Sequence, residues 1–472
     1  MPPALRPSVL KNQHTAPRAP GGAMAVPSPV FVSSLLVPVL LLVPAPPPPT
    51  APASAGTDFR ELLASARGIG PAVCALAADG VRSGGWGGGW EAPAMPLASP
   101  PRLRLRRAHR SLISAEDGRA LVAALAAADA CERQLAATLL GQADKALAPE
   151  VARRLSSSSA PERAAALVAL GTMEGASEAG AVQRALADPS ADVRADAAWA
   201  LGRMEARASA SALEGLLRDP EAMVRAAAVV ALGRLESRES AGALQRALRS
   251  DASAEVRRVA AWALGQIHDR AGAEALAGAL EADGEAEVRE MAAWALAESR
   301  VRDAADVLAA TLRGDASADV RETAAWALGE LDSRKSVAAL TDALADREPR
   351  VRATAAWALG QTGADRAPAA LVKAIRDPDD EVRLRAAWAL SQIRDAQATP
   401  AIKDALRGET HERVRQAEIR ALLEAGDPPD DVLRGLLDSK DPKTRELAVR
   451  ALAGRRAPWP WPWPQPRPRP FP

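Results

Sequence analysis

Residues 315–329 have the sequence Asp-Ala-Ser-Ala-Asp-Val-Arg-Glu-Thr-Ala-Ala-Trp-Ala-Leu-Gly, and variants of this pattern recur along most of the chain. Alignment on the arginine of the pattern gives eleven units that are 30 to 32 residues apart. A period near 31 residues, sustained over more than 300 residues, is typical of a solenoid of repeated helix pairs rather than of separate domains. The repeat arginines are Arg133, Arg163, Arg194, Arg225, Arg257, Arg289, Arg321, Arg352, Arg383, Arg415 and Arg445.

Each unit has the features of an amphipathic helix followed by a second helix. In the unit of Arg194 the apolar residues follow helical spacing and form one stripe, made of Val193, Ala197, Ala200 and Leu201. The glycine after this leucine is expected to allow close helix approach or an early helix end. An aspartate precedes the motif valine by five residues and is expected to cap the first helix and to bond with the repeat arginine of an adjacent unit. These aspartates are Asp188, Asp219, Asp251, Asp283, Asp315, Asp346 and Asp377.

The composition supports helices and disfavours several functional classes. Apolar residues make up 48% of the 472 residues and aromatic residues only 3%, a mixture that suits close-packed helices and suits β-sandwiches poorly. The 60 basic residues nearly balance the 59 acidic ones, so the sequence does not predict a nucleic-acid binder. Only 4 His and 2 Cys are present, and we expect no metal site and no cofactor.

The first 55 residues are predicted to be a targeting segment. The apolar run at residues 30–43 is short for a membrane span but has the length of a signal-peptide core. The triplet Ala53-Ser54-Ala55 fits the cleavage site that would follow it. We therefore expect export to a periplasmic or extracellular location. The alternative is an uncleaved anchor, which is the only membrane association expected.

The part of the chain between the targeting segment and the C-terminal tail is predicted to consist of two regions. Residues 56–113 are irregular, contain Gly and Pro with short helices, and suggest no function. Residues 114–454 form the repeat solenoid. In an exported protein Cys74 and Cys131 would be able to form a disulfide, and the sequence leaves their bonding open.

The repeated core Val-Arg-x-x-Ala-Ala-x-Ala-Leu-Gly resembles the HEAT-like repeats of the phycobilisome-lyase type, in the ARM/HEAT superfamily. The resemblance covers residues 114–454, about 70% of the chain. It implies a right-handed, all-α solenoid of about eleven helix pairs, with a concave surface formed largely by the first helices. It implies no single activity, because function resides in sites placed on the fold.

Two enzymatic relatives share this scaffold. Deoxyhypusine hydroxylases hold two irons with several His-Glu pairs, whereas this chain has the single pair His411-Glu412. Phycobilin lyases need a tetrapyrrole pocket, and no residue pattern here indicates one. We therefore expect no catalytic residues. A lyase-like or hydroxylase-like activity inherited with the fold is the alternative.

A tryptophan recurs five residues after the repeat arginine and is predicted to point away from the core, toward the concave face. The polar residues that we expect on the same face include Arg203, Gln266, Glu298, Glu330, Gln361 and Gln392. Five consecutive exposed indoles would offer about 1,000 Å² of apolar surface, more than a monomer usually exposes. The rings either fill space between repeats or form a track for an extended ligand such as a Pro-rich peptide or a glycan. The tryptophans are Trp199, Trp262, Trp294, Trp326, Trp357 and Trp388.

The tail at residues 455–472 alternates proline with tryptophan, arginine and phenylalanine, which favours polyproline II over helix. Such segments dock on aromatic grooves, so the tail is a hypothetical ligand of its own solenoid or of another copy. The sequence as a whole predicts a non-catalytic protein-binding or scaffold module. A spacer that binds only copies of itself is a further alternative.

Overall fold

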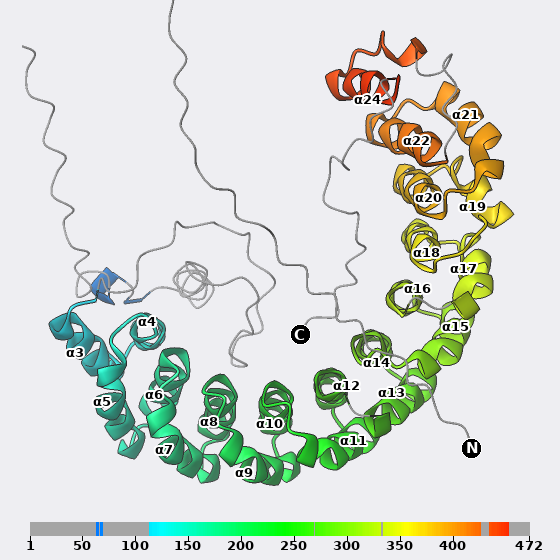
Figure 1. Cartoon of the computed structure of the whole chain (residues 1–472). Coiled ribbons are helices and arrows are strands. Elements are labelled where there is room, and N and C mark those ends of the chain that lie inside the picture. The colour runs from blue at the N-terminus through cyan, green and yellow to red at the C-terminus, as the bar shows by residue number, and fades with distance from the viewer. Residues whose placement is uncertain are drawn as a thin grey trace, which may run out of the picture. The chain divides into compact units, whose positions relative to one another are not determined.

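The computed structural model describes residues 63–65, 67–68, 113–268, 270–331, 334–425 and 434–452. These residues form helices joined by short turns and contain no strand. The helices alternate between an inner and an outer row of a curved stack, and successive inner helices pack on one another (Figure 1). The predicted all-α solenoid of repeated helix pairs is therefore confirmed.

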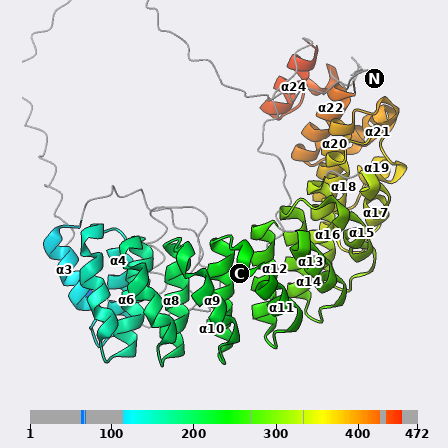
Figure 2. The same cartoon turned by 60° about the horizontal axis from the view of Figure 1, so that its bottom comes forward.

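The inner row consists of the helices that carry the repeat arginines, and a second view shows them stacked side by side (Figure 2). They are α4 (Ala130–Leu140), α6 (Ala160–Met173), α8 (Ala191–Arg203), α10 (Ala222–Arg234), α12 (Ala254–Ile267), α14 (Ala286–Glu298), α16 (Ala318–Glu330), α18 (Pro349–Gln361), α20 (Asp380–Ile393), α22 (Glu412–Glu424) and α24 (Pro442–Leu452).

The outer row is made of shorter helices, several of them extended by a 3-10 turn. The helices are α3 (Ala115–Ala124), α5 (Ala148–Ala152), α7 (Ala179–Arg184), α9 (Ala210–Gly215), α11 (Ala241–Ser250), α13 (Arg270–Ala282), α15 (Ala305–Gly314), α17 (Val337–Ala343), α19 (Ala369–Ala374) and α21 (Thr399–Gly408). The 3-10 turns are η1 (Lys145–Leu147), η2 (Arg153–Ser156), η3 (Ala176–Glu178), η4 (Ala185–Ala187), η5 (Arg207–Ser209), η6 (Leu216–Arg218), η7 (Arg238–Ser240), η8 (Arg302–Ala304), η9 (Arg334–Ser336) and η10 (Ala396–Ala398).

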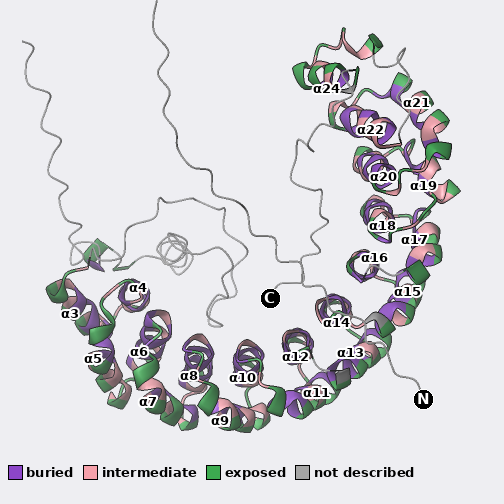
Figure 3. Cartoon of the chain, viewed as in Figure 1, coloured by how far each residue is buried: buried purple, intermediate pink, exposed green. Residues whose placement is uncertain are grey.

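The core runs through the stack between the two rows and between neighbouring repeats. Buried residues dominate the inner helices, and exposed residues are more frequent in the outer row (Figure 3). The predicted stripe of α8 is fully buried, as shown by Val193, Ala197, Ala200 and Leu201. A single repeat cannot bury this much apolar surface alone, so each unit depends on its neighbours for stability.

The helix starts differ from the expectation in one respect. The N-cap residue of α8 is Ser190, and Asp188 precedes it in the turn before the helix. The carboxylate of Asp188 accepts a hydrogen bond from the backbone N–H of Ser190 at 2.9 Å. The aspartate therefore stabilises the turn that leads into the helix instead of capping the helix itself. The prediction that Asp188 is the N-cap residue is therefore wrong, because Ser190 occupies that position.

The motif glycine allows close helix approach and does not end the helix. Helix α8 continues through Gly202 to Arg203, and the chain reverses at Glu205, whose φ is 54°. A Cβ placed on Gly202 would lie 2.9 Å from the Cα of Ala231 in the next inner helix, too close for a stable contact. Of the two roles predicted for the glycine, close approach is the one that the structure confirms.

Several predicted features lie outside the described residues. They are the N-terminal segment 1–55 with its apolar run, most of the region 56–113, Cys74, and the tail 455–472. Cys131, at the start of α4, is buried and takes part in a disulfide. Beside it Arg67 donates to Glu132 at 2.8 Å, which ties a short N-terminal segment to α4. Among the helices that the structure describes, none combines the length and the apolar character needed to cross a membrane.

Candidate functional site: the inner face of the solenoid

The repeat arginines form a ladder of ion pairs that joins consecutive repeats. Arg194 donates through Nε and Nη2 to the carboxylate of Asp219 at 2.7 and 2.9 Å, and through Nη1 to the carbonyl oxygen of Asp188 at 2.9 Å. Eight of the eleven repeat arginines thus clamp the loop before their own helix to the loop before the next one, as the sequence predicts. The pairs are Arg163–Asp188, Arg194–Asp219, Arg225–Asp251, Arg257–Asp283, Arg289–Asp315, Arg321–Asp346, Arg352–Asp377 and Arg383–Glu409.

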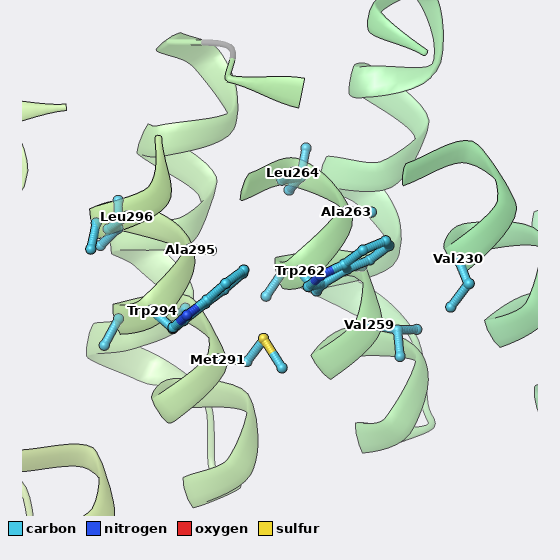
Figure 4. Close-up of a cluster of buried hydrophobic side chains, with 14 of the residues drawn as sticks. Val230, Val259, Trp262, Ala263, Leu264, Met291, Trp294, Ala295 and Leu296 are labelled. Atoms are coloured by element: carbon cyan, nitrogen blue, oxygen red, sulfur yellow. The ribbon is translucent and has the colours of Figure 1, made fainter. Parts of the chain in front are cut away.

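Five of the six recurring indoles are buried, and none of these five is more than 8% exposed; they are Trp199, Trp262, Trp294, Trp357 and Trp388. Figure 4 shows the rings of Trp262 and Trp294 extending from their helices toward the preceding repeat. The expectation of an open aromatic track is therefore wrong for these five residues. Their rings fill space between repeats, which is the packing interpretation of the same pattern.

Four of the rings lie on the motif glycine of the preceding repeat. A Cβ on Gly233 would meet the ring of Trp262 at 2.6 Å, and a Cβ on Gly360 would meet the ring of Trp388 at the same distance. The other two pairs are Gly171 with Trp199 and Gly329 with Trp357. Glycine and tryptophan thus interlock across the repeat boundary, because the missing side chain of one makes room for the indole of the other.

Trp326 of α16 is the exception and is only partly buried. The residue that should receive its ring, one repeat earlier on α14, is Ala297 and not glycine. In four other repeats a Cβ at this position would meet the ring at 2.6 to 2.7 Å. The Cβ of Ala297 therefore keeps the Trp326 indole from packing on α14 in the same way. The side chain of Trp326 packs against the core and remains partly accessible on α16.

The polar residues predicted beside the tryptophans end the inner helices and are half-buried or exposed. Half-buried are Arg203, Gln266 and Glu298; exposed are Glu330, Gln361 and Gln392. Arg203 lies 4.0 Å from Glu174, the residue at which the chain leaves the preceding inner helix. The same arrangement recurs with the signs of charge reversed: Arg394, at which the chain leaves α20, lies 3.4 Å from Glu424 at the end of α22. Arg203 and Glu424 therefore bridge neighbouring repeats, a role that the sequence analysis did not predict.

Helices α14 and α16 carry the same acidic and aromatic pattern. Residues four apart share one side of a helix, so each helix presents a Glu-Trp-Glu stripe. The two stripes, together called the Glu-Trp-Glu face, consist of Glu290, Trp294 and Glu298 on α14 and of Glu322, Trp326 and Glu330 on α16. Burial, reinforced by the carboxylate of Asp319, raises the pKa of Glu290 to about 7. Burial also raises the pKa of Glu322 and of Glu330.

Glu418 of α22 occupies a position that is alanine in the preceding inner helices. Its side chain is fully buried, and neither carboxylate oxygen has a hydrogen-bond partner. Burial raises the pKa of Glu418 from 4.5 to about 8, and the nearby Glu409 adds to the shift. The folded protein therefore favours the protonated acid.

A pH dependence of the C-terminal repeats follows. The folded-state pKa of Glu418 exceeds the unfolded value, so its contribution to stability is complete below pH 4.5 and is lost as the pH rises to about 8. Over that interval the free energy of unfolding should fall by about 1.4 kcal/mol per pH unit. Glu418→Ala should remove this slope, measured by hydrogen exchange of α22, whereas the exposed control Glu446→Ala should keep it. An unchanged slope in Glu418→Ala would contradict the assignment.

No group of three or more His, Cys, Asp or Glu among the described residues is arranged to hold a metal ion. The pair His411-Glu412 lies at the start of α22, where His411 Nε2 is 3.2 Å from Asp380.

Comparisons with known proteins agree with this architecture. The family model for HEAT repeats matches residues 178–265, 241–319, 305–391 and 368–453, which together make up more than half of the chain. None of the curated proteins matches the sequence.

Solved structures share the fold at low sequence identity. Yeast importin-β, Kap95p, is 17% identical over 72% of this chain and 57% of its own, with a TM-score of 0.50. Kap95p in a structure concerned with its binding to RanGDP is 15% identical over the same shares, with a TM-score of 0.51. Human deoxyhypusine hydroxylase is 24% identical over 52% of this chain and 96% of its own, with a TM-score of 0.25. The likeness to importin-β is one of fold alone, and this chain spans little more than half of importin-β.

Proposed function

Because the chain belongs to the HEAT-repeat family, we propose that it is a non-catalytic protein-binding scaffold whose inner face takes up an extended peptide. The observation that carries the proposal is the series of half-buried and exposed polar side chains, one per repeat, on consecutive inner helices. Neighbouring inner helices are about 8–10 Å apart, so an extended chain of about three residues spans each repeat. The binding of RanGDP by Kap95p, a protein of the same fold, supports a protein as the partner.

The buried indoles change how such a peptide would be held. An open aromatic track would bind through stacking along its whole length, but five of the six rings are buried within the stack of repeats. Binding through the inner face would instead use polar contacts, with stacking confined to Trp326. We therefore propose weak, salt-sensitive recognition of an extended peptide, which suits a scaffold.

Selection of a random peptide library on the full chain tests this function. Enriched peptides should bind at least tenfold more weakly to a variant with Gln361→Ala and Gln392→Ala, two exposed inner-face positions, because the hydrogen bonds of the two side-chain amides are lost. The matched control carries Glu239→Gln and Glu281→Gln, exposed positions on η7 and in the outer row, and should bind as the parent does. Failure to enrich any peptide, or equal loss in the control variant, would argue against the inner face as the binding surface.

Two alternatives predict different measurements. A hydroxylase-like enzyme would contain two irons per chain, which metal analysis of the purified protein would detect. A spacer that binds only itself would assemble as its concentration increases and would enrich no peptide.

We also propose that the protein is exported, and the disulfide at Cys131 supports an oxidising compartment. Cell fractionation tests the location.

A further inference from the structure

The strongest unexplained feature of the inner face is the partly accessible ring of Trp326. It lies four residues from both Glu322 and Glu330, on the same side of α16. An indole surrounded by carboxylates offers a planar surface together with negative charge. Among side chains, the arginine guanidinium matches both properties, because it stacks on aromatic faces and donates to carboxylates.

The cations that already face this surface are largely engaged. Arg350 of α18 binds both Asp319 and Glu322. Arg385 of α20 donates to Glu381 at 2.7 Å. Arg300 lies close enough to Glu330 to oppose the rise of its pKa. Glu290 accepts only a long hydrogen bond, 3.3 Å, from the hydroxyl of Thr323. The carboxyl groups of the Glu-Trp-Glu face thus outnumber the arginines that face them.

We propose that the Glu-Trp-Glu face binds the arginine-bearing, proline-rich segment 455–472 of the same chain. Residues 455–472 include four Arg, eight Pro and no acidic residue, so the charges of segment and face are complementary. Proline-rich segments dock on exposed aromatic rings with little loss of conformational entropy, since they are extended before binding. The inference rests on the peptide-binding function proposed above and names one site and one occupant for it.

The length of the segment is compatible with binding within one molecule. Four repeat steps separate α16 from α24, which corresponds to about 40 Å at the usual spacing of packed helices. The twenty residues after Leu452 would extend about 60 Å in polyproline II geometry. A tethered segment of this length has a high effective concentration near the site, so even a weak site would be occupied.

The experiment uses a labelled synthetic peptide of residues 455–472 and fluorescence anisotropy. The peptide should bind a chain truncated after residue 454 at least tenfold more tightly than it binds the full chain, because the full chain occupies its own site. Affinity for the truncated chain should fall at least tenfold when Glu290→Gln and Glu322→Gln are combined. The outer-face control, Glu239→Gln with Glu281→Gln, should leave the affinity unchanged. A peptide with Arg467→Gln and Arg469→Gln should bind weakly to every variant.

Ala297→Gly tests the role of the ring without removing it. Glycine at position 297 should let the Trp326 indole lie on α14, as four of the other indoles lie on their glycines. The variant should keep its fold, shift its tryptophan emission to shorter wavelength and bind the peptide at least fivefold more weakly. Trp326→Ala should weaken binding at least as much.

The outcomes separate this inference from the proposed function. Equal peptide binding by the truncated and full chains, or binding insensitive to Ala297→Gly and to the glutamate changes, would overturn the tail assignment. No binding of the tail peptide by any variant would overturn it as well. Library peptides that still depend on Gln361 and Gln392 would then leave the inner face as a peptide-binding surface for another partner. A concentration-dependent dimer of the full chain would indicate exchange of tails between copies and would contradict binding within one molecule.

Discussion

Trp388→Ala is expected to lower the free energy of unfolding of the C-terminal repeats by about 3–5 kcal/mol. The ring of Trp388 is fully buried, contacts the helix around Gly360 and stacks on Trp357 with ring centroids 6.5 Å apart. Its removal leaves a cavity at a repeat boundary, where the stability of a solenoid is most sensitive. Hydrogen exchange of α18 and α20 measures the effect, and Gln392→Ala, an exposed change on the same helix, is the matched control.

The contact between Trp388 and Gly360 also predicts the effect of changing the glycine. Gly360→Ala should destabilise the same repeats, because the new Cβ would lie 2.6 Å from the Trp388 ring. Adding Gly360→Ala to Trp388→Ala should cost less than adding it to the parent, since the contact with the ring is gone. Part of the cost should remain, because the new Cβ would still lie 2.9 Å from the Cα of Ala389. Additive effects of the two substitutions would show that the glycine is not required by the indole.

Asp219→Ala is expected to cost about 3–5 kcal/mol, the usual effect of removing one partner of a buried ion pair. Both side chains of the Arg194–Asp219 pair are largely buried, so the lone guanidinium would lose its charge partner away from water. Adding Arg194→Met should restore part of the stability, because no unpaired charge then remains. Local unfolding measured by hydrogen exchange of α8 and α10 gives both values. A double variant as unstable as the sum of the two single variants would contradict this account.

The same ladder should make the protein sensitive to acid. The hydrogen bond from Arg194 holds the pKa of Asp219 below its ordinary value of 3.8, and that from Arg163 does the same for Asp188. A lowered folded-state pKa means that the stabilisation is present above pH 3.8 and is lost as the pH falls through the folded-state pKa. The loss should be cooperative along the stack, because neighbouring repeats share the aspartates. In Asp219→Ala the acid transition, followed by circular dichroism, should begin at a higher pH than in the parent.

Much of the fold could be predicted because local features repeat. The arginine spacing gave the period, and the spacing of Val193, Ala197 and Leu201 gave the buried stripe. The link between Arg194 and Asp219 was predicted because an unpaired charge in a packed repeat would be costly. The capping role of Asp188 was misjudged by a few residues, since the exact helix start depends on how the preceding turn is hydrogen-bonded.

The candidate site was predicted only in part. Helical periodicity gives the direction of the Cα–Cβ bond, and on that basis the indoles were placed on the inner face. A tryptophan side chain is long enough to turn back onto the neighbouring repeat, and the glycines at positions 233 and 360 leave room for it. The sequence did contain the signal for the exception, since Ala297 interrupts the glycine series one repeat before Trp326. Its meaning required knowing which helix faces which.

The sequence by itself determined the repeat, the all-helical class, the buried stripe and the ion-pair ladder, because each depends on residues within one unit or on the identical contact between successive units. Only the tertiary structure decided which aromatic rings are covered and which polar residues pair across repeats. Those outcomes depend on the space left at the boundary between neighbouring helices. At that boundary the methyl group of Ala297 leaves the Trp326 indole partly exposed, whereas the four indoles that lie on a glycine are buried.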